Sequence, residues 1–481
     1  MTVKLLIESS KKGNSGIQLP IKSDFPPIHL ENTFPKEWIR SATGLPNVSE
    51  PEVVRHFTNL ASLNYGVDSG FYPLGSCTMK YNPKINEKLS SLEGFTHTHP
   101  LQSDSTVQGN LFMMKHLEQL LCEITGMDAY TLLPAAGAHG ELTGMMIVKE
   151  YFQHKGEAQK RTKILIPESA HGTNPASAAS VGFDIVEVKS TPCGGVDIAH
   201  LKELIHEDIA AIMLTNPNTA GVFESDILEV AEILHQNGSL LYYDGANLNA
   251  LLGQVRPGDM GFDIVHLNLH KTFSTPHGGG GPGSAPVGVK KHLRKFLPIP
   301  RVTEVNKQFA LEDKDPDSIG MIRLAGSNFQ VLIKAYLYIL SMGAEGLKKA
   351  SSMAVLNANY IKEKLSPFIA AGVSCICMHE CVLTAKDLTA YGVQAKDISK
   401  RLIDYGIHPP TNYFPLIIPE ALMIEPTETE SKETMDHFIE VMKKIVSEAK
   451  EHPELLLDAP HHAPISRPDE VKAAKDLNVA Y

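Results

Sequence analysis

This sequence has few cysteines, no excess of positive charge and no long apolar run. Six cysteines in 481 residues are too few for a disulfide-rich secreted scaffold. The 44 Lys and Arg against 55 Asp and Glu give a net charge of −11, which argues against binding nucleic acid or an anionic membrane through overall charge. No run approaches the about 18 apolar residues of a membrane-spanning helix, and the first twenty residues do not resemble a secretory signal. A cytoplasmic protein is therefore predicted.

Three of the six cysteines, Cys375, Cys377 and Cys381, lie close together. Residues 373–378 alternate between apolar and polar like a half-buried strand, which would place Cys375 and Cys377 on one face. Their spacing is not that of a zinc site, and cysteine also packs as a small hydrophobic residue. We predict neither a metal site nor a disulfide here.

The chain has the composition of an ordinary globular protein, with 43% hydrophobic and 21% charged residues. Disordered, collagen-like and coiled-coil classes are excluded. The pattern along the chain predicts four segments: an N-terminal arm and extended segment at 1–95, a large domain at 96–330, a small C-terminal α+β domain at 331–450, and an extended tail at 451–481. Prolines are frequent in the first sixty residues and in the tail, so an irregular arm is expected at both ends.

Short apolar runs alternate with helical patterns between about residues 128 and 290. The runs predict strands at 129–133, 163–166, 183–188, 210–214, 239–243, 263–267 and 285–289. Helices are predicted between most of them, as at 141–154 and 225–236. This order is typical of an α/β fold with a mostly parallel sheet and helices on both faces. Further on, helices are predicted at 328–341, 345–365, 396–405 and 432–449, with strands near 373–378 and 422–425.

Lys271 follows a predicted strand, in a segment that also contains three histidines, Asn268 and the four-glycine run 278–281. Glycines allow the backbone to approach a ligand closely. A lysine near a second cation or in an apolar pocket loses its proton readily and can form a Schiff base. A solvated surface lysine is the plain alternative, and the neighbouring strand ends decide against it.

Asp244 ends an apolar strand and precedes Lys271 by 27 residues. Ligands of open α/β sheets bind at the carboxyl ends of the strands. Pyridoxal phosphate needs a lysine, an acid for its ring nitrogen, a group flat against the ring and anchors for its phosphate. Asp244 could supply the acid, whereas a helix cap is its plain alternative.

Three more strand ends carry suitable residues. His171 follows one strand and could stack on the cofactor ring, although a lone histidine is more often structural. Small residues from Ala135 to Gly140 join a strand to a helix, where exposed N–H groups suit a phosphate. The segment 215–221 offers polar groups at the same edge. Five strand ends thus place polar or glycine-rich turns on one side of one sheet.

These motifs resemble the glycine cleavage system P-protein family, the decarboxylating glycine dehydrogenases. The resemblance rests on the Lys271 segment, on the string from Pro73 to Pro83, and on the segments 139–141, 221–224 and 464–470, and it covers nearly the whole chain. The family occurs as one long chain of two related halves or as two separate subunits. This chain has one such half and retains the lysine, so it is similar to the lysine-bearing second subunit.

The resemblance implies a fold-type-I enzyme with pyridoxal 5′-phosphate held as an aldimine at Lys271. It would decarboxylate glycine and pass the aminomethyl group to the lipoamide arm of the H-protein. By motif position, the residues expected at the cofactor are Lys271, Asp244 on the ring nitrogen, His171 and Ala246 on the ring faces, Ala136, Gly137, Ala138, His139 and Asn268 at the phosphate, and Asn216 and Thr219 nearby. Asn216 and Asn218 stand where some long-chain members have tyrosine and serine. His270 and His277 are the candidate proton-transfer bases, and His270 is counted with the catalytic residues.

The resemblance also implies partners. A sister subunit that lacks the lysine is expected, in two copies of each, together with the lipoyl H-protein. Two alternatives stay open: another fold-type-I enzyme, such as an aminotransferase or a cysteine desulfurase, and a non-catalytic subunit of the same complex.

Overall fold

A computed structural model describes residues 3–17, 29–277, 283–323 and 326–477. The four-glycine run 278–281, expected to lie close to a ligand, is outside the described residues. The chain divides into two compact units, one made of Met1–Gly70 with His461–Tyr481 and the other of Phe71–Pro460.

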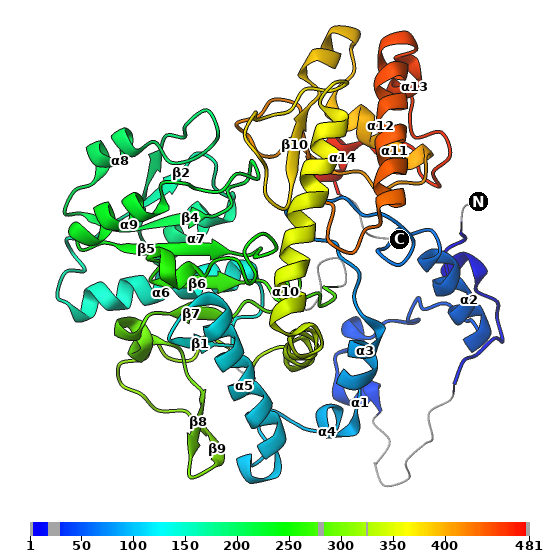
Figure 1. The fold of residues 1–481 in the computed structure, drawn as a ribbon. Helices are drawn as coiled ribbons and strands as arrows, with labels where there is room; N and C mark the ends of the chain where they lie inside the picture. The colour runs from blue at the N-terminus through cyan, green and yellow to red at the C-terminus, as the bar shows by residue number, and fades with distance from the viewer. Residues whose placement is uncertain (1–2, 18–28, 278–282, 324–325, 478–481) are drawn as a thin grey trace. The chain divides into compact units, whose positions relative to one another are not determined.

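The larger unit contains a seven-stranded sheet (Figure 1). Its strands are β1 (Ala129–Thr131), β2 (Lys163–Pro167), β3 (Asp184–Val188), β4 (Ile209–Thr215), β5 (Leu240–Gly245), β6 (Ile264–Leu267) and β7 (Val287–Val289). They lie in the order β1-β7-β6-β5-β4-β2-β3, and β7 runs in the opposite direction to the other six. The predicted mostly parallel sheet is confirmed, and each of the seven predicted runs overlaps a strand.

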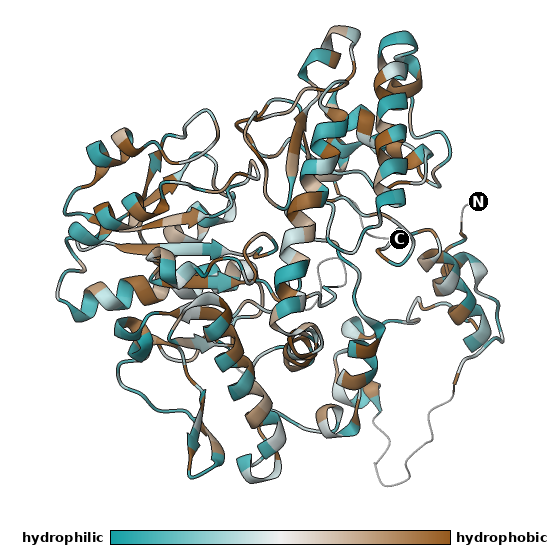
Figure 2. Cartoon of the chain, viewed as in Figure 1, coloured by the Kyte–Doolittle hydropathy of each residue, from teal (hydrophilic) through white to brown (hydrophobic). Residues whose placement is uncertain are grey.

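Alternate residues of the strands enter two separate cores, because successive side chains of a strand point to opposite faces. In β5, Leu241 and Tyr243 belong to one core, whereas Leu240 and Tyr242 belong to the other. The first core also contains residues of four helices, α5 (Gln108–Thr125), α8 (Ile198–Leu204), α9 (Ile227–Gln236) and α10 (Phe329–Leu365). The second contains residues of α6 (Gly137–His154) and α7 (Thr173–Val181). Helices therefore cover both faces, as predicted, and α5 carries apolar residues along one side (Figure 2).

A second sheet of three antiparallel strands lies in the C-terminal part of the larger unit. It is built from β10 (Cys381–Thr384), β12 (Ala421–Ile424) and β11 (Thr411–Asn412), and it shares a core with α10, α11 (Ala395–Asp404), α12 (Lys432–Glu451) and α13 (Glu454–Leu457). Within α10 the backbone of Gly343 is not helical, with φ 59°. This break falls in the gap between the two helices predicted at 328–341 and 345–365. The remaining strands, β8 (Arg301–Val305) and β9 (Gln308–Glu312), form a hairpin.

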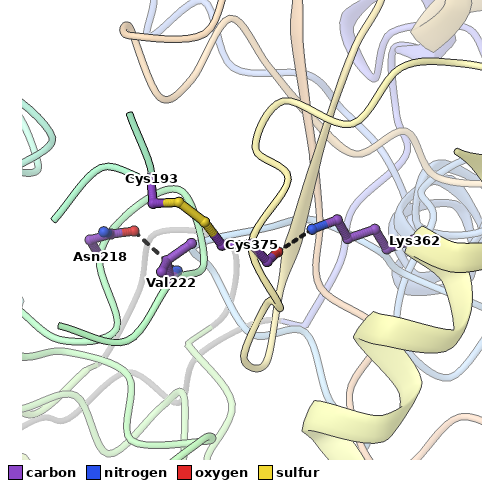
Figure 3. Close-up of a disulfide and its surroundings, with 5 residues drawn as sticks. All are labelled: Cys193, Asn218, Val222, Lys362 and Cys375. Atoms are coloured by element: carbon purple, nitrogen blue, oxygen red, sulfur yellow. Dashed lines mark hydrogen bonds between the residues drawn. A yellow bond between two sulfur atoms is a disulfide. The ribbon is translucent and has the colours of Figure 1, made fainter. Parts of the chain in front are cut away.

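The strand predicted at 373–378 is wrong, and so is the prediction of no disulfide there. Cys375 pairs with Cys193, which follows β3, and its carbonyl accepts from Lys362 of α10 (Figure 3). Asn359 bonds both the N–H and the carbonyl of Cys377, and the N–H of Met378 donates to the carbonyl of Gly221 at 2.6 Å. The backbone of this segment is satisfied by side chains and a turn, so no strand ladder forms.

The smaller unit contains α2 (Glu50–Ala61), where the sequence analysis expected irregular structure. A capping box starts this helix, since the N–H of Ser49 donates to Glu52 at 2.7 Å. Pro51 stands in the first turn, where a missing N–H costs nothing. Short helices α1 (Leu30–Thr33), near the start of the chain, and α14 (Glu470–Lys475), in the tail, also belong to this unit. Across the described segments, no helix is both long and apolar enough to cross a membrane.

Candidate active site

A cavity of about 160 Å³ lies where the turns after the parallel strands meet. Eight of the predicted site residues line it: Gly137, Ala138, His171, Thr219, Asp244, Ala246, Asn268 and Lys271. Within the described part of the chain, Ala136, His139, Asn216 and His270 are not among its lining residues. Parallel strands carry their carboxyl ends to one edge, which is why residues more than 130 positions apart converge here.

Lys271 lies in a tight turn directly after β6. Its N–H donates to the carbonyl of Asn268 at 3.0 Å, and its own carbonyl accepts from Ser274 N at 3.2 Å. Leu269 and Phe273 flank it and are completely buried, so they fix the turn in the core. The backbone of Ser274 is left-handed, at φ 55°, a conformation that costs energy for a residue with a side chain. The turn therefore holds Lys271 on the cavity wall.

Asp244 is buried at the end of β5, with 3% of its surface exposed. Its Oδ1 accepts from the N–H of Ala246 at 3.1 Å and lies 3.3 Å from Nε2 of His266. Burial raises the pKa of Asp244, but His266, the Ala246 N–H and Lys271 outweigh it, so the pKa lies below its ordinary value. The carboxylate is thus ionised at neutral pH, which suits a protonated ring nitrogen.

His266 is a group that the sequence analysis did not select. It lies completely buried on β6, and its Nδ1 is 2.7 Å from the hydroxyl of Tyr242, which is also buried. Tyr242, His266 and Asp244 therefore form a buried row of polar groups behind the cavity. Its signal in the sequence was weak, because a histidine inside an apolar strand is usually structural.

His171 lines the cavity from the turn after β2. Its Nδ1 lies 2.8 Å from the hydroxyl of Thr173, and that hydroxyl donates to Oε1 of Glu141 at 2.7 Å. The ring of Phe414 makes an edge contact with the imidazole, with centroids 5.7 Å apart. These contacts orient the imidazole of a residue that lines the cavity.

The N-terminus of α6 has the form of an anion cradle. A Cβ at Gly137 would lie 2.8 Å from Nδ2 of Asn268, so a larger residue here would displace the Asn268 amide. Asn268 Oδ1 is buried and has no hydrogen-bond partner among the described residues. The first N–H groups of a helix point outward without partners. His139 Nδ1 accepts from Ala135 N at 3.1 Å, and burial together with the charge of Arg323 lowers the pKa of His139. Arg323 was not predicted, and its Nη1 is buried without a partner in the described chain.

The asparagines after β4 have separate positions. Asn216 is buried in the turn, where its Oδ1 accepts from Glu224 N at 2.9 Å and its carbonyl accepts from the hydroxyl of Tyr243. Asn218 lines the cavity, and its Nδ2 has no partner among the described residues. Thr219 donates its hydroxyl to the carbonyl of Ser169 at 2.6 Å.

His270 and His277 lie next to each other, with ring centroids 5.6 Å apart, and neither is among the lining residues found in the described chain. Burial, followed by the charge of Lys271, lowers the pKa of His270 to about 3, so its ring is neutral at pH 7. His277 also has a lowered pKa because of burial, and its Nε2 lies 3.3 Å from the sulfur of Met79.

Three lining residues come from segments to which the sequence analysis gave no site role: Ser76, His379 and Glu380. Asn247, next to the predicted Ala246, also lines the cavity. The string 73–83 connects the small sheet to the Lys271 turn, since Gly75 N donates to Met423 O at 3.3 Å and Lys80 donates to the carbonyl of Thr272 at 2.9 Å. The sequence shows this string as a motif of the family, but it does not show that the string lies at the site. His379 and Glu380 carried no local signal, because two polar residues before a strand read as a loop.

These residues fit pyridoxal phosphate. The first N–H groups of α6 can donate to a phosphate, Asp244 is ionised, and Lys271 lies on the same cavity wall. The fold and the cavity together define an enzyme of the fold-type-I class that binds pyridoxal phosphate on a lysine.

Comparisons with known proteins identify the family. The family described as "Glycine cleavage system P-protein" matches residues 28–309, and "Glycine dehydrogenase, C-terminal domain" matches residues 350–463. Proteins named "Probable glycine dehydrogenase (decarboxylating) subunit 2" from Caldanaerobacter subterraneus subsp. tengcongensis and Thermotoga maritima are 59% and 58% identical, over 98% of this chain and 97% and 98% of theirs. The chain belongs to the glycine cleavage system P-protein family, so the resemblance seen in the sequence is confirmed.

Solved structures agree on the fold. A crystal structure of "glycine decarboxylase (P-protein) of the glycine cleavage system" aligns with a TM-score of 0.71 at 20% identity, over 86% of this chain and 94% of that one. A cysteine desulfurase from Thermococcus onnurineus aligns with a TM-score of 0.63 at 13% identity, over 79% and 95%. At these identities the likeness supports the fold-type-I architecture alone.

Proposed function

We propose that this chain is the lysine-bearing subunit of a glycine dehydrogenase (decarboxylating), which releases CO2 from glycine and transfers the aminomethyl group to the lipoamide of an H-protein. The observation that carries the proposal is the placement of Lys271 and Asp244 on one cavity at the carboxyl edge of the sheet, in a chain that matches the P-protein family over 28–309. The same placement favours a catalytic subunit over a non-catalytic one.

Pyridoxal phosphate, when bound, supplies an electron sink for the bond to the departing carboxyl group. The chain's own residues prepare the cavity for it. Lys271 provides the amine that holds the cofactor, and the ionised Asp244 keeps a proton on the ring nitrogen. Gly137, Ala138 and Asn268 hold the phosphate at the start of α6. His171, oriented by Thr173, and Ala246 confine the ring.

The partners of the chain belong to the same proposal. The relatives are named as a second subunit, which supports a sister subunit that lacks the lysine. We propose an assembly of two copies of each, a lipoyl H-protein as the acceptor, and a cytoplasmic location.

Exchange of labelled CO2 into glycine tests the function. The chain is assayed alone, with the sister subunit, and with both the sister subunit and a lipoyl H-protein. We expect exchange only from the assembled enzyme, and none from Lys271→Ala, while Lys396→Ala, an exposed lysine of α11, keeps it. Borohydride should fix the cofactor on Lys271. Exchange that persists in the Lys271→Ala enzyme would exclude the proposed role of this lysine.

A further inference from the structure

Glu380 is a carboxyl group on the cavity wall that the proposed function has not used. It precedes β10 and is 5% exposed. Its Oε2 accepts from the N–H of Ser76 at 3.0 Å. Its Oε1 has no hydrogen-bond partner in the described chain, although Glu380 lines the same cavity as Lys271. One carboxyl oxygen is therefore fixed, and the other is available.

The backbone around Glu380 holds it in place. Ser76 is left-handed, at φ 69°, and the string that contains it is fastened at Gly75, whose carbonyl accepts from Thr411 at 2.7 Å. On the other side, a Cβ at Gly221 would lie 2.2 Å from the carbonyl oxygen of Glu380, so the turn after β4 packs directly on this residue. A side chain held from both sides is suited to a defined role in the cavity.

Burial and the nearby carboxylate of Glu425 raise the pKa of Glu380 to about 8, against the lowering effects of the Ser76 N–H and of Lys271. Glu380 is thus mostly protonated at pH 7. The titratable groups that face it from its own segment, from the neighbouring elements and across the cavity are Glu425, Lys271, Cys77, His379, Cys377, Cys381, Asp244, His171 and Glu141.

The other two acids that line the cavity, Asp244 and Glu141, are each held by other groups. Asp244 is kept ionised by its neighbours. Glu141 accepts from Thr173 through Oε1 and from Ser177 through Oε2. The predicted bases His270 and His277 are not among the lining residues found. Glu380 remains as the acid with an available oxygen near Lys271.

We infer that Glu380 is the proton partner of Lys271 during the exchange of amines at the site, an inference that rests on the proposed function. When the neutral amino group of the substrate takes the place of Lys271, the bond of Nζ to the cofactor carbon would break as the bond of the substrate nitrogen forms. One proton of the substrate amine would pass to Nζ, and a second would reach Nζ from Glu380, whose O–H bond at Oε1 breaks. This leaves a carboxylate beside an ammonium group. When Lys271 is captured again at the end of the cycle, the proton returns to Glu380. No other reactant is needed, and the charges balance at each stage.

The test combines a titration with kinetics. Infrared spectra of the full chain without cofactor follow the carboxylic acid band with pH. A band that disappears with a midpoint near pH 8 is expected in the wild type and should be absent from Glu380→Gln. Lys271→Ala should move the midpoint upward, because the lysine charge lowers the pKa of Glu380. A merely structural carboxyl group would not respond to Lys271.

The kinetic part uses the assembled enzyme with pyridoxal phosphate. Glu380→Gln should slow glycine–CO2 exchange by roughly 10²- to 10⁴-fold, the range for loss of a general acid–base group. Glu380→Asp should restore part of the rate, and Glu430→Gln, a partly buried carboxyl whose pKa is also raised, should keep full exchange. The inference would be overturned if Glu380→Gln exchanged at the wild-type rate. It would also be overturned if Lys271→Ala left the midpoint of the carboxylic acid band unchanged. The titration needs no glycine chemistry, so it separates failure of this inference from failure of the proposed function.

Discussion

Replacing Lys80 should show how much of the site depends on one buried ion pair. Lys80 Nζ lies 2.8 Å from Oε1 of Glu428, and only 1% and 10% of the two side chains are exposed. The same nitrogen donates to the carbonyl of Thr272 at 2.9 Å, directly beside Lys271. Burial lowers the pKa of Lys80, but Glu428 outweighs it and the pKa lies above its ordinary value, so the lysine is charged.

The magnitude follows from what remains after Lys80→Met. Glu428 keeps a bond from the hydroxyl of Tyr338 at 3.2 Å, but its charge is buried without a cation. Breaking one side of a buried pair costs about 3–5 kcal/mol, and an unsatisfied carbonyl at Thr272 costs about 1–3 kcal/mol. These overlap, since both arise from one side chain, so we expect the free energy of unfolding to fall by about 3–5 kcal/mol.

Urea unfolding of the single and double variants measures this cost. Lys80→Met with Glu428→Gln removes both charges, so it should recover much of the loss, because no unpaired charge stays buried. The Lys271 turn should also loosen in Lys80→Met, and pyridoxal phosphate should bind more weakly. A loss below about 1 kcal/mol, or a double variant no more stable than Lys80→Met, would refute the reasoning.

Three further predictions concern the cavity. Asp244→Asn should still bind pyridoxal phosphate but exchange glycine on the order of 10²-fold more slowly, because the ionised partner is lost; normal exchange would contradict its role. Gly137→Ala should weaken cofactor binding about tenfold in a spectral titration, since its Cβ would lie 2.8 Å from Asn268, while Gly109→Ala, which has open space around it, should not. Because the pKa of Glu380 is raised from 4.5 to about 8 in the folded chain, ionising it disfavours folding, so stability should fall as the pH rises from 4.5 to 8. That part of the pH dependence should vanish in Glu380→Gln, as measured by urea unfolding at each pH.

The sheet could be predicted from the sequence because each strand carries its own signal. The run at 210–214 is apolar throughout, and the run at 239–243 is apolar or aromatic after Ser239. This is expected for strands covered on both faces, and the two runs correspond to β4 and β5. The cofactor residues could be predicted for the same reason. Asp244 lies at the end of β5 and Lys271 lies shortly after β6. Parallel strands all end at one edge, so position along the chain already implies proximity in space.

Only the tertiary structure decided which residues from outside the sheet line the cavity. Glu380 and Ser76 are 304 positions apart and meet because the string 73–83 passes along β12. No periodicity records such a contact. At residues 373–378 a local pattern predicted a strand that the structure does not contain. Asn359 and Lys362 bond the backbone carbonyls of Cys377 and Cys375, and Cys375 forms a disulfide with Cys193. A strand needs a neighbour for its hydrogen bonds, and the sequence of one segment does not say whether that neighbour exists. The sequence by itself thus determined the sheet and its cofactor edge. The cavity wall formed by Ser76, His379 and Glu380 depended on long-range packing.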